Sequence, residues 1–202
     1  AIKEFEKCLS YMKAKDKSNY QYVCSKLGRL YFLIGNYPSS LQYLLEALKT
    51  AELLKDDASV GKYSGNIGNI YSQINEQEKA LDYYLKALTI AQKCNNTQSI
   101  ATNKVQIGGV FFHQNEYDKA FEFYMDALKI NEEIQKTYFL ANNYLVLAQC
   151  EIKRKHLTEA NSYLTKAKAL AIKSQDYEML SSINIELSKL MIEKANYLEA
   201  EK

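Results

Sequence analysis

The sequence contains very few residues that interrupt helices or build tight turns. It has one proline (Pro38), seven glycines and no tryptophan among 202 residues. So little glycine and proline leaves almost no material for β-hairpin turns or for a glycine-rich phosphate loop. Hydrophobic residues make up 47% and charged residues 25% of the chain, which is too apolar a composition for a disordered protein. The composition therefore predicts a folded, all-α protein.

The sequence also lacks a marked excess of charge of one sign and any long apolar run. The formal net charge is +2, and basic residues are interleaved with acidic ones, so we expect no nucleic acid partner. The seventeen tyrosines fall mostly at packing positions of the repeat described below, and do not indicate stacking on bases. No stretch approaches the ~20 apolar residues that span a bilayer, so we expect no membrane insertion. The expected compartment is the cytoplasm, with a periplasmic sensor region as the alternative.

Residues that could take part in catalysis or bind a metal ion are few and widely separated in the sequence. Three of the four cysteines, Cys8, Cys24 and Cys150, are interpreted as small apolar packing residues, because no CxxC pair or compact disulfide pattern occurs. His113 and His156 have no second histidine, cysteine or carboxylate at metal-ligand spacing. Phosphate-loop, nucleophile-elbow and kinase motifs are absent from the sequence. We therefore predict no catalytic residues, no metal site and no cofactor, and expect that the protein is not an enzyme.

The chain matches itself at an offset of forty residues. An aliphatic-Gly-x-x-aromatic motif occurs at Leu27-Gly28-x-x-Tyr31, Ile67-Gly68-x-x-Tyr71 and Ile107-Gly108-x-x-Phe111, and more loosely at Leu147-Ala148-x-x-Glu151 and Leu187-Ser188-x-x-Met191. A second apolar segment follows each motif and begins at Ser40, Ala80, Ala120 and Ala160. Its apolar residues recur every three or four positions, the spacing of an amphipathic helix. Each unit is therefore predicted to contain two helices.

Small residues at fixed points of the repeat predict where the two helices approach each other. Gly28, Gly68 and Gly108 share one such point in the first helix. Side chains larger than alanine do not fit where helix axes come within ~8 Å. A glycine inside a helix costs about 1 kcal/mol relative to alanine, so its recurrence indicates a steric requirement. Asn75 and Glu78 also have the spacing of a capping box at the start of a helix.

The paired motifs resemble the tetratricopeptide repeat (TPR), and the resemblance covers essentially the whole chain. The usual tryptophan and the usual late proline are missing, and the period is forty residues rather than about 34. This is similar to the long variety found in kinesin light chains, Leu-Gly-Asn polarity adaptors, Rap-type regulators and the sensory regions of bacterial histidine kinases. HEAT and armadillo arrays share the period but not the paired motif. The resemblance implies a right-handed superhelical solenoid of antiparallel helical hairpins.

We expect a single TPR array that has been cut from a longer protein. Its expected divisions are a partial repeat at 1–17, repeats at 18–57, 58–96, 97–136 and 137–176, and a partial repeat at 177–202. Interrupted hairpins at both ends would expose apolar side chains, and end-to-end self-association is then a possible outcome. The side chains concerned are Phe5, Leu9, Leu187, Leu190 and Met191.

The resemblance also implies a ligand groove lined by the first helix of each repeat. The groove positions of the family, carried over one by one, fall here on Lys26, Arg29, Phe32, Lys62, Asn66, Asn69, Gln73, Gln106, Phe112, His113 and Gln149. Side-chain amides both donate and accept hydrogen bonds, which suits the backbone of an extended peptide. Glu186 and Glu193 would make the far end of the groove acidic. The alternative is that these residues are only a solvated surface.

The sequence thus predicts a protein- or peptide-binding scaffold that uses the concave groove. The alternative is a sensory or regulatory arm of a larger signalling protein, such as a histidine kinase, a transcription regulator or a Rap-like protein, that responds to a peptide or partner. Of the residues by which family members grip chaperone tails, only Asn66 agrees, so such tails are disfavoured.

Overall fold

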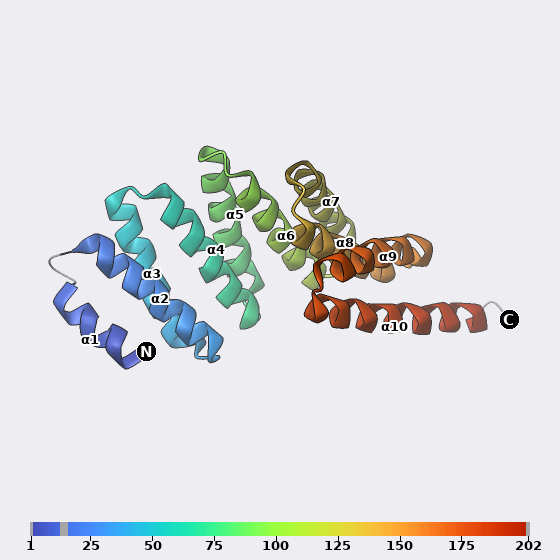
Figure 1. The fold of residues 1–202 in the computed structure, drawn as a ribbon, viewed down its shortest axis with the longest axis horizontal. Coiled ribbons are helices and arrows are strands. Elements are labelled where there is room, and N and C mark those ends of the chain that lie inside the picture. Colours follow the sequence, from blue (N-terminus) through green and yellow to red (C-terminus); the bar gives the residue numbers. More distant parts are fainter. Residues whose placement is uncertain (1, 13–15, 201–202) are drawn as a thin grey trace. The chain divides into compact units, whose positions relative to one another are not determined.

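The computed structural model describes residues 2–12 and 16–200, and these residues form a succession of helices (Figure 1). The described helices are α1 (Ile2–Met12), α2 (Lys17–Leu33), α3 (Tyr37–Leu54), α4 (Asp57–Gln73), α5 (Gln77–Lys93), α6 (Thr97–His113), α7 (Tyr117–Ile134), α8 (Thr137–Lys153), α9 (Leu157–Ser174) and α10 (Tyr177–Ala200). No strand occurs within the described ranges, so the all-α prediction is confirmed. None of these helices combines the length and the apolar character that crossing a bilayer requires.

The helices pack into two compact units, one reaching Ser99 and the other beginning at Ile100. In unit 1, α2 packs on α3 and α4 packs on α5, while α3 contacts α4 and α1 contacts α2. In unit 2, α8 packs on α9, α7 contacts α8, and α10 contacts both α8 and α9. Within each unit, consecutive helices from α2 onward are joined by only two or three residues, so they run antiparallel as hairpins.

A residue with left-handed backbone lies just after every helix from α2 to α9, at intervals of twenty residues. The first is Gly35, with a φ of 75°. The others are not glycines and are Lys55, Asn75, Asn95, Asn115, Gln135, Lys155 and Gln175. A capping side chain follows at several of these turns. For example, Asn36 accepts a hydrogen bond from the Ser39 amide at 3.1 Å.

The predicted capping box at Asn75 is wrong. Asn75 has a φ of 62° and forms the left-handed turn, so it precedes the helix cap instead of providing it. The N-cap residue of α5 is Glu76, and its side chain makes no capping hydrogen bond. Asn75 was correctly predicted to lie at a helix boundary. There it adopts a positive φ, which asparagine tolerates better than most residues.

The predicted close approach at the repeated glycines is confirmed. A Cβ atom on Gly28 would lie 2.6 Å from Leu44 Cγ, far inside van der Waals contact. The same atom on Gly68 would lie 2.6 Å from Cε1 of Tyr84, and on Gly108 it would lie 2.6 Å from Cε1 of Tyr124. Each of these three glycines is therefore covered by a large side chain of the second helix.

Two expectations about single residues are wrong. Cys8 is exposed, whereas Cys24 and Cys150 are buried as expected. Leu190 was expected to be exposed at the interrupted end, but it is 2% exposed because it belongs to the apolar cluster that α10 shares with α8 and α9. Its neighbour Met191 is 70% exposed, as expected. End-to-end self-association stays a prediction.

Candidate functional site

A pocket of about 550 Å³ in unit 1 lies between α2 and α4, the first helices of two repeats. Six of the predicted groove residues line it, namely Lys26, Arg29, Phe32, Lys62, Asn66 and Asn69. Residues three or four positions apart share one face of a helix, which brings Lys26 and Arg29 of α2 to the same wall. Leu44 of α3 also contributes to the lining.

The unit 1 pocket carries positive charge without acidic residues. Its lining includes Lys26, Arg29 and Lys62 but no aspartate or glutamate. None of the three forms an ion pair with another described residue, and Lys26 instead lies 5.0 Å from the ring centroid of Tyr22. A concave surface with charge of one sign attracts ligands of the opposite sign. The pocket therefore favours an anionic group.

One hydrogen bond from a buried tyrosine fixes the orientation of an amide in this pocket. The hydroxyl of Tyr84 donates to Oδ1 of Asn69 at 2.8 Å. Tyr84 is 2% exposed, and burial raises the pKa of its phenol to about 12, so the hydroxyl keeps its proton at neutral pH. Because the carbonyl oxygen of Asn69 is engaged, its NH₂ group is left to donate to a ligand. Arg29, Lys62 and Asn69 then all offer donors.

A second cavity, in unit 2, has a volume of about 490 Å³ and lies between α6, α8 and α10. Three predicted groove residues, Phe112, His113 and Gln149, line it. Gly109 and the deeply buried Tyr124 also border this cavity. The wall contributed by α8 and α10 includes Ile152, Lys153, Glu186, Lys189, Ile192 and Glu193.

The acidic residues of the unit 2 cavity are paired with cations or amides. Oε1 of Glu186 accepts hydrogen bonds from Nε2 of Gln149 at 3.0 Å and from Nζ of Lys189 at 2.8 Å. Glu193 accepts from Nζ of Lys155 at 2.6 Å, and this hydrogen bond lowers the pKa of the Glu193 carboxyl. The acidic character that the sequence predicts at Glu186 and Glu193 is therefore largely neutralised.

Two predicted groove residues do not line either of these pockets. Gln73 is exposed at the last position of α4, and Gln106 is half-buried in α6. Among the residues that the structure describes, no three histidine, cysteine, aspartate or glutamate side chains converge as a metal site would require.

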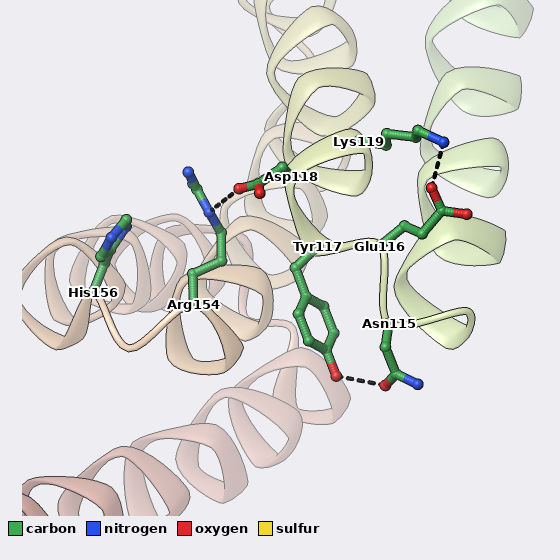
Figure 2. A pocket seen from close by; sticks show the side chains of 7 residues that line it. All are labelled: Asn115, Glu116, Tyr117, Asp118, Lys119, Arg154 and His156. Carbon is green, nitrogen blue, oxygen red and sulfur yellow. Dashed lines mark hydrogen bonds and ion pairs between the residues drawn. The ribbon is translucent and has the colours of Figure 1, made fainter.

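A third pocket, of about 620 Å³, lies at the turns that precede α7 and α9 (Figure 2). Figure 2 shows Arg154 reaching Asp118, with Nε and Oδ1 2.9 Å apart, while Lys119 reaches Glu116 on the other side. The hydroxyl of Tyr117 donates to Asn115 at 2.6 Å. Most polar groups of this pocket thus satisfy one another, so it is less suited to a ligand than the two pockets on the first helices.

The third pocket borders an ion-pair cluster that sequence reasoning missed. His156 was expected to have no carboxylate at metal-ligand spacing, and sequence reasoning did not predict the contact in which its Nδ1 lies 2.6 Å from Oε2 of Glu151. The other oxygen of Glu151 accepts from Arg154 at 2.7 Å, and Glu151 is 2% exposed. Glu151 stands where Tyr71 and Phe111 stand in earlier repeats, and that irregularity of the motif was the available signal.

A model of the tetratricopeptide repeat matches residues 22–93 and 99–173, more than half of the chain. A comparison with curated proteins gives no match. Among solved structures, the chain is similar to the apo form of RapI, with 23% identity and a TM-score of 0.86 over 100% of this chain and 77% of that one. It is also similar to a Rap protein complexed with competence and sporulation factor, with 17% identity and a TM-score of 0.80, over 90% of this chain and 51% of that one.

A third similar structure is a signal transduction ATPase with a tetratricopeptide repeat sensor, from Pyrococcus horikoshii. The identity is 19% and the TM-score 0.75, over 97% of this chain and 33% of that one. At these identities the likeness shows a common fold.

Proposed function

Because the chain belongs to the tetratricopeptide repeat family, we propose that it is a non-catalytic scaffold that binds an extended, acidic segment of a protein partner along its first helices. The observation that carries this proposal is the unit 1 pocket, where three unpaired cations and an oriented amide meet without a single carboxylate in the lining. The charge of this surface has no acidic partner among the residues that the structure describes, so an acidic ligand complements it.

Different residues of the pocket would contact different parts of the bound segment. Arg29 and Lys62 would contact carboxylates of the segment, but exposed ion pairs contribute only about 0–1 kcal/mol each and act mainly on orientation and association rate. Asn66 and Asn69 would bind backbone carbonyls through their NH₂ groups. Apolar contact would come from Phe32 and from Leu33, which is 67% exposed at the pocket edge.

The test begins with selection of twelve-residue peptides from a displayed random library against the purified chain. Fluorescence anisotropy then gives the Kd of the selected peptides for the native chain and for the Asn66→Ala/Asn69→Ala variant. We expect the double variant to bind at least about tenfold more weakly. Asn161→Ala, at an exposed position of the second helix α9, is the matched control and should bind normally. Selected peptides should be rich in aspartate and glutamate.

The proposal fails if binding survives in Asn66→Ala/Asn69→Ala and is lost instead when residues of the second helices are changed. It also fails if the selected peptides are basic. Circular dichroism of each variant separates loss of binding from loss of fold.

A second candidate function is a sensory or regulatory arm of a larger signalling protein. Similar folds in a Rap protein complexed with a factor and in a signal transduction ATPase with a repeat sensor favour it. Small-angle scattering with and without a selected peptide distinguishes the two functions. A sensor arm should change its radius of gyration on binding, because a repeat array can deform as a whole, whereas a static scaffold should not.

A further inference from the structure

Tyr84 and Tyr124 occupy the same position in successive repeats, and their hydroxyl groups meet different surroundings. The ring of Tyr84 packs on Gly68 and that of Tyr124 packs on Gly108, the repeated glycine of the facing helix in each case. In unit 1, the hydroxyl of Tyr84 donates to Asn69. The residue forty positions after Asn69 is Gly109, which has no side chain to accept a hydrogen bond. The internal partner of the tyrosine is therefore missing in unit 2.

The hydroxyl of Tyr124 borders the unit 2 cavity and has no hydrogen-bond partner among the described residues. Tyr124 is 3% exposed, and it lines the unit 2 cavity together with Gly109. Its hydroxyl would lie 3.9 Å from a Cβ atom at Gly109, so it faces the space that a longer side chain at this position would fill. Burial raises the pKa of this phenol, which therefore keeps its proton at neutral pH. A ligand that accepts from this hydroxyl gains a hydrogen bond for which the described residues supply no acceptor.

Acceptors also line the cavity. Nε2 of Gln149 donates to Glu186, which leaves the carbonyl oxygen of Gln149 free to accept. Oε2 of Glu186 accepts no hydrogen bond from the described residues, although the residue is only 7% exposed. Phe112, Ile152 and Ile192 form an apolar part of the wall, and the remaining polar lining is His113, Lys153, Lys189 and Glu193. The cavity thus places the hydroxyl of Tyr124 opposite acceptors inside a partly apolar enclosure.

We propose that the unit 2 cavity binds a primary carboxamide, the side chain of an asparagine or glutamine in the bound segment. The carboxamide oxygen accepts from Tyr124, and the NH₂ group donates to Gln149 and Glu186. The ligand then supplies in unit 2 the amide that Asn69 supplies within unit 1. This inference rests on the proposed function for the origin of the ligand, but the cavity itself can be tested alone.

Other ligand groups fit the cavity less well. A carboxylate would satisfy Tyr124 and would be attracted by Lys153. It would, however, leave the carbonyl oxygen of Gln149 without a donor and would lie beside the carboxylate of Glu186. An ammonium group would leave the Tyr124 donor unpaired and would face Lys153 and Lys189. An aliphatic side chain would fill the space but would leave both the donor and the acceptors without partners.

The direct test uses three small probes: N-acetyl-glutamine methylamide, N-acetyl-glutamate methylamide and N-acetyl-leucine methylamide. All three carry the same backbone amides, so differences between them report the side chain. Titrations of the ¹⁵N-labelled chain should shift the backbone signals of Phe112, Gln149 and Glu186 with the glutamine probe. The glutamate and leucine probes at the same concentration should leave these signals in place. Equal shifts with all three probes would overturn the carboxamide assignment.

The matched variants are Gly109→Asn and Gly109→Ala. The helical backbone at Gly109 has room for a side chain, since the nearest atom to a Cβ lies at 3.9 Å. Gly109→Asn should accept the hydrogen bond of Tyr124, occupy the cavity and abolish the shifts, whereas Gly109→Ala should retain most of them. If the Gly109→Asn variant responds like the native chain, the ligand does not bind at Tyr124 and the proposal is wrong.

Measurements of peptide binding distinguish this proposal from the proposed function. In peptides that bind the chain, replacing one glutamine or asparagine by glutamate should weaken binding at least about tenfold, and Gly109→Asn should remove that difference. If no peptide binds while the glutamine probe shifts the signals, the scaffold function fails and the cavity takes a free carboxamide. If peptides bind through Asn66 and Asn69 but no carboxamide position matters, the scaffold stands and the cavity proposal fails.

Discussion

Unit 1 and unit 2 are built from the same forty-residue repeat, yet their pockets differ in chemistry. The first helices of unit 1 carry Lys26, Arg29 and Lys62, which have no acidic partner among the described residues. Those of unit 2 carry Glu186 and Glu193, each already paired with a lysine. The repeat sets the backbone and the packing of the hairpins, while a few positions that it leaves unconstrained set what each unit can bind.

The two units also differ in how side chains pack between the two helices of a hairpin. Aromatic rings stack between the two helices of a hairpin at Tyr71 and Tyr83, with centroids 5.5 Å apart. In the last complete hairpin of unit 2 the first of these positions is Glu151, and Tyr163 stacks instead on Tyr144 at 6.1 Å. One substitution in the repeat therefore replaces an apolar contact by a partly buried ion-pair cluster around the buried Glu151. The following predictions test how much each difference matters.

The largest effect is expected at the buried ion pair of unit 2. Arg154→Ala should destabilise the chain by roughly 3 kcal/mol, because the buried Glu151 side chain would lose its guanidinium partner and have only His156 beside it. Asp118→Ala removes the exposed partner of the same arginine and should cost less than about 1 kcal/mol. Urea denaturation measures the free energy of unfolding of both variants. Equal costs would mean that burial of Glu151 is not what makes this arginine important.

Next in size is the contrast between two adjacent glycines. Gly108→Ala should cost about 1–3 kcal/mol, because the added Cβ would lie 2.6 Å from the ring of Tyr124. Gly109→Ala should instead stabilise by about 0.5–1 kcal/mol, since the site is helical and open. Thermal melting followed by circular dichroism gives the sign of each change. Two shifts in the same direction would contradict the packing described here.

A smaller effect should separate the two buried tyrosines. Tyr84→Phe removes a satisfied hydrogen bond to Asn69 and should cost about 1 kcal/mol. Tyr124→Phe removes a hydroxyl that has no partner among the described residues and should leave the stability unchanged or slightly raised. Chemical denaturation of both variants checks this difference. A cost at Tyr124 as large as that at Tyr84 would show that its hydroxyl is satisfied in the free protein.

The last prediction concerns alkaline pH. Burial raises the pKa of Tyr84 from 10.0 to about 12, so the folded chain holds this proton after the unfolded chain has released it. The stabilisation is complete below pH 10 and declines as the pH rises towards 12. The free energy of unfolding of Tyr84→Phe should fall less steeply over this interval than that of the native chain. Parallel curves would mean that Tyr84 titrates normally.

Periodic features of the molecule were predictable from the sequence because they depend on neighbours close in the chain. The glycine contacts at Gly68 and Gly108 and the positions of the helices follow from motifs repeated at fixed spacing. The pocket lining at Lys26 and Asn66 followed from family positions on one face of a helix. These predictions needed only the repeat and the geometry of a helix.

Features that depend on a single departure from the repeat were not predicted. The pairing of Glu151 with His156 requires a carboxylate in place of an aromatic ring, and the forty-residue pattern gives no rule for its partner. The orientation of the Asn69 amide depends on the hydroxyl of Tyr84, fifteen residues away on another helix. The burial of Leu190 depends on how α10 lies against α8 and α9. Each is a matter of three-dimensional packing between specific side chains.

The evenly spaced left-handed residues between helices have a consequence for how such a chain can change its length. Each turn consists of a left-handed residue and the cap of the next helix, repeated every twenty residues from Gly35 to Gln175. Suppose that a helix lost or gained a few residues while the packed helices kept their positions. A residue from the end of the helix would then move into the turn, and a β-branched or bulky residue disfavours the left-handed conformation there. Duplication or loss of whole repeats keeps every turn in register, so the chain is modular and can be lengthened or shortened by complete hairpins.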